Sequence, residues 1–344
     1  MSETAEKILQ TRGKTTELDA YVVKASFDRA GTACAFALGD GTVAIKPLAG
    51  EAWHRVPTHE GAILALATDA APQGWITGGD DGHFMRIGPD GAITLIAPFG
   101  MRWVDTVTSF TDGRTRLVAC SSGKKLMVFD AANTKLKTLE HPSTVTGMVF
   151  DGKGKRIAAS HYDGASVWLV ASRSDSPRKL DWKGSHIGIV MSPDGDSVVT
   201  AMQENALHGW RLSDNQHMRM TGYPSKTLGL SFSKSGKWLA SSGADSVVLW
   251  PFFGGGPMGK PPTELAGGDG ITCTYVACHP KDDLVAAAFE DGLVVIADIG
   301  SARILPVAGP GRGPVTTLAW SPDGSHLAFG TEGGFAAVID LSKT

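Results

Sequence analysis

Short runs of alternating apolar and polar residues repeat along the whole chain, and each run ends in a polar turn. Residues 315–324 read VTTLAWSPDG, and residues 187–195 and 228–236 follow the same plan. A second apolar run follows each turn, and a third follows another short turn. Alternation with a period of two predicts half-buried β-strands joined by hairpins, because successive side chains of a strand point to opposite faces. No unit contains a helical pattern of about 10–15 residues, which argues against a βαβ arrangement.

The turns between the second and third runs are evenly spaced. They fall at Asp40, Asp81, Gly123, Asp163, Glu204, Ala244, Asp291 and Gly333. Their mean separation is about 42 residues, and the turns after the first runs keep the same spacing. A repeat of this length with three or four short strands predicts a β-propeller blade. We therefore expect an all-β, single-domain propeller over residues 1–344 with eight four-stranded blades, and seven blades as the alternative.

Several local motifs resemble those of the WD-repeat (WD40) β-propeller family. The turn Ser-Pro-Asp-Gly occurs at 192–195 and 321–324, and Trp210 and Trp250 end the third strands of their units. A His precedes the first strand at His59, His141 and His186. No unit carries the family's full His–Ser/Thr–Asp–Trp hydrogen-bonding set, so the units are assigned mainly by their period.

The resemblance also implies how the ring closes. The last unit ends at Leu341, which leaves no room for a fourth strand, whereas residues 1–17 precede the repeats of 18–344. We expect this N-terminal segment, with Glu6–Arg12 as its strand, to complete the last blade. Such pairing removes an exposed sheet edge.

Composition narrows the class of protein. The chain has 32 Lys and Arg against 35 Asp and Glu, and this balance makes a nucleic-acid partner unlikely. No apolar stretch reaches about 18 residues, and the N-terminus is polar, so neither a membrane span nor a signal peptide is expected. Cys273 and Cys278 would lie on opposite faces of one strand, which excludes a disulfide between them. Reduced thiols favour a cytoplasmic protein.

Enzyme motifs are weak. Residues 254–260 read GGGPMGK, which matches part of a phosphate-binding loop, but Pro261 replaces the required Ser or Thr and no helix pattern follows. The acidic residues are scattered among turns, where Asp bonds its own backbone. We expect no cofactor.

A metal site is an alternative. His141, His161, Asp163 and His186 are expected on one face of neighbouring blades, and His and Asp are zinc ligands. Their spacing is not compact, and the resemblance explains His141 and His186 as structural hydrogen-bonding residues. The favoured prediction is that no metal binds.

A protein-binding face has wider support. The loops before the first strands and the turns between the second and third strands share one face in this kind of propeller. Trp, Tyr and Arg dominate interface hot spots. The candidates on this face are His83, Arg102, Trp103, His161, Tyr162, His186, Tyr223 and Arg312, together with Lys124, Lys125 and Lys226. Trp103 could instead pack between blades. A second surface is expected near Phe252 and Phe253, one of which would be exposed.

The family resemblance implies a non-enzymatic scaffold that docks an unidentified protein over the central channel. The alternative is a metal-dependent or hydrolytic enzyme with its site at the channel mouth, and a third possibility is a regulatory subunit of a larger assembly. Fold alone does not decide among them.

Overall fold

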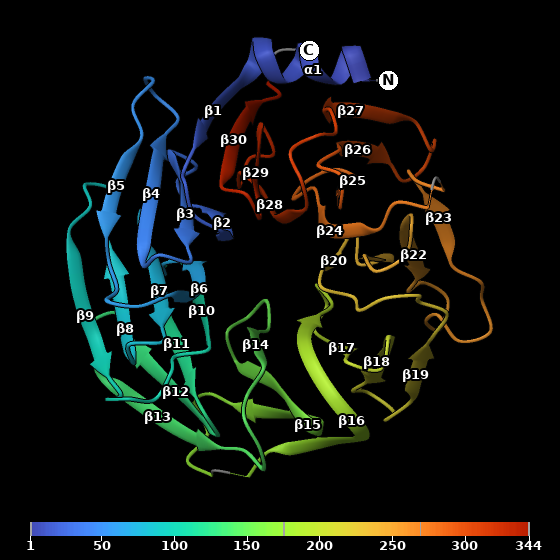
Figure 1. Ribbon diagram of the computed structural model, residues 1–344. Helices are drawn as coiled ribbons and strands as arrows, with labels where there is room; N and C mark the ends of the chain where they lie inside the picture. The colour runs from blue at the N-terminus through green and yellow to red at the C-terminus, as the bar shows by residue number, and fades with distance from the viewer. Residues whose placement is uncertain (1, 175, 269, 343–344) are drawn as a thin grey trace.

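The strands are arranged in a ring around a central channel. The computed structural model describes residues 2–174, 176–268 and 270–342. Figure 1 shows the chain passing once round the ring, with the N-terminal helix and the last strands side by side. The innermost strand of each unit contacts that of the next, and β28 contacts β2, so the ring is closed.

Six of the sheets have four antiparallel strands each, joined in sequence order apart from the closing sheet. They comprise β2 (Val22–Phe27), β3 (Ala33–Leu38), β4 (Thr42–Pro47) and β5 (His54–Pro57); β6 (Ile63–Thr68), β7 (Trp75–Gly79), β8 (His83–Ile87) and β9 (Ile93–Pro98); β10 (Thr106–Thr111), β11 (Arg116–Ser122), β12 (Lys125–Asp130) and β13 (Lys135–Glu140); β20 (Leu230–Phe232), β21 (Trp238–Ser241), β22 (Val247–Pro251) and β23 (Thr263–Leu265); β24 (Cys273–Cys278), β25 (Leu284–Phe289), β26 (Val294–Asp298) and β27 (Ile304–Ala308); and β28 (Val315–Trp320), β29 (His326–Thr331), β30 (Phe335–Asp340) and β1 (Gly13–Glu17).

The prediction of eight separate four-stranded blades is wrong. The described strands form seven sheets, the number kept as the alternative, and one of these sheets has six strands. It contains β14 (Gly147–Phe150), β15 (Arg156–Leu169), β16 (Arg178–Met191), β17 (Ser197–Met202), β18 (Ala206–Arg211) and β19 (His217–Met220). β16 pairs with β15 up to Ser185 and with β17 from His186 onward. Two sequence units therefore share one sheet, because no break in strand pairing separates them.

The N-terminal segment closes the ring, but not with the residues expected. β1 pairs with β30, from Gly13 opposite Ile339 to Glu17 opposite Phe335. The predicted strand Glu6–Arg12 lies instead in helix α1 (Ser2–Arg12). This segment is rich in good helix formers, and its Ala5 and Leu9, four residues apart, are both buried.

The core lies between neighbouring sheets, where apolar side chains of adjacent units interlock. One cluster joins Leu9 of α1 to Val294 and Ile296 of β26 and to Ile339 of β30. All four cysteines are free, so the predicted absence of a Cys273–Cys278 disulfide is confirmed. Burial raises the pKa of the Cys273 thiol to about 12.

Candidate partner-binding face

One face of the ring carries the loops that lead into each first strand, called here the lead-in loops. Each lies against the turn between the second and third strands of a neighbouring unit. The amide of Val104 donates to the carbonyl of Gly79 at 3.0 Å, and Cys273 donates to Ala244 at 2.8 Å. These bonds place the loops and turns on a common surface, as the family resemblance implies.

Large apolar side chains are exposed on these loops and turns and, at Tyr162, within β15. Trp103 is 58% exposed, Met101 is 99% exposed, and Tyr162 is 59% exposed. Leu228, just before β20, and Tyr21, just before β2, are exposed as well. Trp103 is therefore a surface residue and does not pack between sheets. We call Tyr21, Met101, Trp103, Tyr162 and Leu228 the apolar set.

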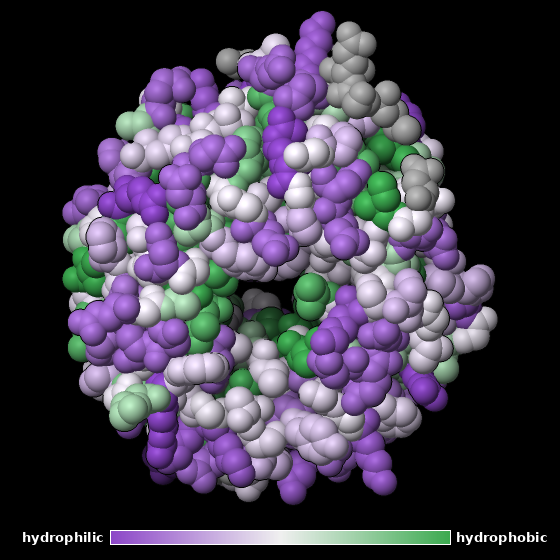
Figure 2. Space-filling view, viewed as in Figure 1, coloured by the Kyte–Doolittle hydropathy of each residue, from purple (hydrophilic) through white to green (hydrophobic). Residues whose placement is uncertain are grey.

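The channel mouth forms a depression on this face. It has a volume of about 630 Å³ and includes Leu228 and Lys226, with Glu290 and Glu332 from other units. Figure 2 shows the open channel in one view of the molecule, with hydrophobic residues at parts of its rim and polar residues around the periphery. A surface that mixes exposed apolar groups with both signs of charge suits a protein partner.

His83 lies at the edge of an ion-pair network. Its Nδ1 is 3.1 Å from Asp81, which is also 2.9 Å from Nδ1 of the buried His59. Burial opposes ionisation of Asp81, but hydrogen bonds from His59 and His83 outweigh it and lower the pKa of Asp81 to about 2. Burial lowers the pKa of His59, although Asp81 partly counteracts this. The neighbouring candidate Arg102 is exposed beside Trp103.

Three sequence candidates lie in the interior, and the expectation that they are surface residues is corrected. His161 is 2.9 Å from Ser166 Oγ, and His186 is 2.7 Å from Thr200 Oγ1. Tyr223 is hydrogen-bonded to Ser241 and is also buried. Their polar atoms have hydrogen-bond partners within the chain, so they have a structural role.

Arg312 is also engaged within the chain. Its guanidinium donates to Glu6 of α1 at 2.7 Å and lies 5.0 Å from the ring centroid of Phe335. This contact fixes the N-terminal helix to the lead-in loop of β28. Lys226, in contrast, lines the channel mouth. Lys124 lies in an exposed turn, and Lys125 is the exposed first residue of β12.

The residues of the metal alternative do not form a ligand set. The rings of His141 and His161 lie 5.8 Å apart, but His141 Nε2 accepts a bond from Trp168 Nε1 at 3.0 Å. Burial, followed by the nearby His161, lowers the pKa of His141 to about 4. Within residues 2–174, 176–268 and 270–342, no group of three or more His, Cys, Asp or Glu is placed to hold a metal ion.

The glycine-rich loop after β22 folds back on itself. Lys260 Nζ donates to the carbonyl of Gly254 at 3.0 Å and lies 4.9 Å from the ring centroid of Phe253. Phe253 is exposed, whereas Phe252 packs against Phe232. One aromatic of the pair is thus exposed, as predicted.

Met101, Leu228 and Tyr21 were missed by sequence reasoning. Each looks like an ordinary apolar residue, and an apolar residue next to a strand is usually expected in the core. Their position could have indicated exposure, because all three lie just before the first strand of a unit.

Comparison with known proteins agrees with this architecture. Residues 276–344 match the model for the WD40 domain of anaphase-promoting complex subunit 4, and residues 215–250 match the model for the WD domain, G-beta repeat. These matches support a WD40 family for this chain. Among the family's hydrogen-bonding positions, His59, Thr77 and Asp81 are joined in one unit, and Tyr223, Ser241 and Trp250 are joined in another.

A curated relative and a solved structure are also similar to this chain. THO complex subunit 3 of Arabidopsis thaliana is 24% identical over 216 residues, which span 61% of this chain and 66% of that relative. The crystal structure of the computationally designed Ika8 protein has 17% identity and a TM-score of 0.74, and the match covers 94% of this chain and 97% of that one. This second likeness concerns the fold alone. No helix in the described parts of the chain is long and apolar enough to cross a membrane.

Proposed function

We propose that this WD40 protein is a non-enzymatic scaffold or subunit that docks a protein partner over the channel mouth. The observation that supports this most is the exposure of Trp103 and Met101 next to Arg102 in one lead-in loop. An aromatic side chain that is already exposed and flanked by Arg is typical of an interface hot spot. The similarity to a protein named as a complex subunit supports the same role.

The remaining members of the apolar set supply a wider contact area. Tyr162 and Leu228 belong to different units, so a partner that touches both and Trp103 spans several units of the face. The carboxylates and Lys226 around the channel mouth offer polar contacts at the rim. An apolar centre with a polar rim is the usual anatomy of a protein interface. The cytoplasmic location stays a prediction.

The test is quantitative cross-linking and affinity purification of the full chain from its native cells. We expect Trp103→Ala to lose at least tenfold of its specific partner, and Met101→Ala to lose less. The matched control is Leu136→Ala, because Leu136 is 49% exposed on the outer strand β13. Equal recovery of the partner by Trp103→Ala and Leu136→Ala would overturn the proposed docking face.

A further inference from the structure

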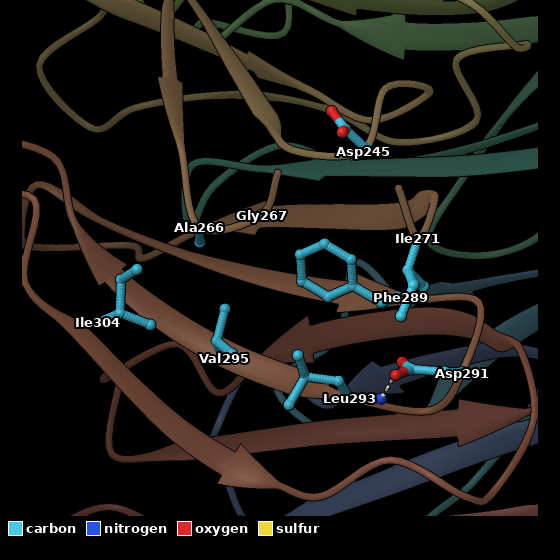
Figure 3. Close-up of a pocket in the computed structure, with 9 residues that line it drawn as sticks. All are labelled: Asp245, Ala266, Gly267, Ile271, Phe289, Asp291, Leu293, Val295 and Ile304. Carbon is cyan, nitrogen blue, oxygen red and sulfur yellow. Dashed lines mark hydrogen bonds between the residues drawn. The ribbon is translucent and has the colours of Figure 1, made fainter. Parts of the chain in front are cut away.

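An apolar groove lies open between the sheet of β20–β23 and the sheet of β24–β27. It forms a cavity of about 130 Å³, with Phe289, Leu293 and Val295 on its inner wall and Ile271 and Ile304 toward solvent. Figure 3 shows the Phe289 ring in the middle of the lining residues, between Ala266 on one side and Leu293 and Val295 on the other. A cavity of about 150 Å³ is known to hold a benzene-sized group, so this groove has room for one side chain.

The next unit along the chain has an equivalent groove, and residues of the chain itself fill that groove. Strand pairing sets Val295 opposite Ala287 and Ala337 opposite Phe329, so Val295 and Ala337 hold the same place in successive units. Leu293 and Phe335 are equivalent by the same register. Ala337 and Phe335 belong to the cluster that contains Leu9 of α1. One unit along the ring, the same kind of groove is therefore occupied by a helix that inserts an apolar side chain.

The filled groove also shows how charge accompanies the apolar side chain. Glu6 lies three residues before Leu9, and its carboxylate pairs with Arg312 at the edge of that groove at 2.7 Å. Residues three apart on a helix lie on the same face, so α1 presents both groups together. The helix thus matches its apolar residue to the groove and its charge to the edge.

The open groove has the opposite charge at its edge. Asp245 and Asp291 both line it, from the turns of adjacent units. Asp291 accepts the amide of Leu293 at 2.9 Å, and neither carboxylate has an ion-pair partner within the described parts of the chain. A positively charged group on a ligand would therefore complement this edge.

We propose that this groove binds a helical segment of a partner protein that carries one apolar anchor residue and a Lys or Arg one turn away. The anchor fills the space beside Phe289, and the cation pairs with Asp245 and Asp291. The bound helix would thus resemble α1, with a basic residue in the place that Glu6 has beside Leu9. This groove is separate from the apolar set, so the proposal does not depend on the proposed docking face.

The test uses a phage-displayed library of randomised helical peptides, selected on the immobilised full chain. Two surface variants report on the groove. Ile304→Lys places a cation beside the cavity, and Asp245→Lys reverses charge at its edge without breaking a side-chain bond of the described structure. Glu60→Lys is the matched control, because Glu60 is an exposed acid in the lead-in loop of β6. Unchanged melting temperatures would show that the variants fold.

We expect clones with Leu or an aromatic residue and a Lys or Arg three or four positions away. Biolayer interferometry should show their binding weakened at least tenfold by Ile304→Lys and Asp245→Lys but not by Glu60→Lys. Failure to obtain clones that depend on the groove would overturn the proposal, and so would clones without a basic residue. If the wild type dimerises in a concentration-dependent way and Ile304→Lys abolishes this, the groove binds a second copy of the chain, and the proposal of a partner helix is overturned. Trp103→Ala should leave peptide binding unchanged.

Discussion

The phenolic oxygen of Tyr223 accepts a hydrogen bond from Trp250 Nε1 at 2.5 Å, and both side chains are buried. The same phenolic group is 2.6 Å from Ser241 Oγ, so three residues from different parts of one unit are joined. The WD40 pattern places a His before the first strand, and Tyr takes that place here. Tyr223, which the sequence analysis placed among the partner-binding candidates, therefore stabilises the interior.

Replacing Tyr223 should destabilise the fold. Tyr223→Phe keeps the ring but leaves Trp250 Nε1 buried without an acceptor, which should cost about 1–3 kcal/mol of the free energy of unfolding. A shift of the urea midpoint at constant slope would measure it. Tyr162→Phe is the matched control, because Tyr162 is exposed and should leave the midpoint unchanged. A Tyr223→Phe midpoint equal to that of the wild type would show that the bond contributes nothing.

The His59–Asp81 pair should make stability depend on acid pH. Its hydrogen bonds lower the pKa of Asp81 from 3.8 to about 2, so the ionised carboxylate favours the folded state. This contribution is complete above pH of about 4 and is lost as the pH falls toward 2. Asp81→Asn should therefore cost about 2 kcal/mol at pH 7, and the difference from the wild type should shrink below pH of about 4. Denaturation at several pH values measures it.

The neighbouring Asp80 provides the control for this pH dependence. Its side chain makes no hydrogen bond within the described residues, so Asp80→Asn should keep the wild-type pH profile. A stability difference between Asp81→Asn and the wild type that stays constant from pH 7 to pH 3 would contradict the assignment.

His208 should make the fold sensitive to acid over a higher pH range. Burial, followed by the nearby His217, lowers the pKa of His208 from 6.5 to about 3, and its ring stacks on Trp182 with centroids 3.8 Å apart. The neutral ring favours folding, so this contribution is present above pH of about 6.5 and is lost as the pH falls toward 3. His208→Phe keeps the stacking and cannot take up a proton.

At pH 7 we expect His208→Phe to change the free energy of unfolding by no more than about 1 kcal/mol, since it loses only the bond to His217. At pH 4 the variant should be more stable than the wild type. The midpoints of guanidinium denaturation at both pH values measure this reversal. His54→Phe, at an exposed position, should show no reversal.

Helix α1 should stabilise the ring through Leu9. Leu9 is 3% exposed and packs in the cluster between β26 and β30, so Leu9→Ala leaves a cavity and should cost about 2–4 kcal/mol. Gln10 follows Leu9 in α1 and is exposed, so Gln10→Ala should lower the free energy of unfolding by less than about 0.5 kcal/mol. Thermal unfolding compares the two. Equal melting temperatures would show that α1 is not part of the cooperative fold.

The sequence by itself determined the propeller, because strand alternation and turn chemistry act within a few residues and repeat with a constant period. The position of most hairpin turns and the free state of Cys273 and Cys278 follow from such local signals. The turn expected at Asp163 lies instead inside β15, and closure by the N-terminal segment was implied by the family resemblance. Trp103 stood out for the same reason, since it lies in a loop outside the alternating pattern.

Only the tertiary structure decided the rest. It joined two sequence units through β16, buried His161, His186 and Tyr223, and turned Glu6–Arg12 into a helix held by Leu9 and Arg312. Each outcome depends on contacts between residues far apart in the chain, where burial and hydrogen bonding outweigh local preference. The open groove beside Phe289 is of the same kind, because its walls come from two different units.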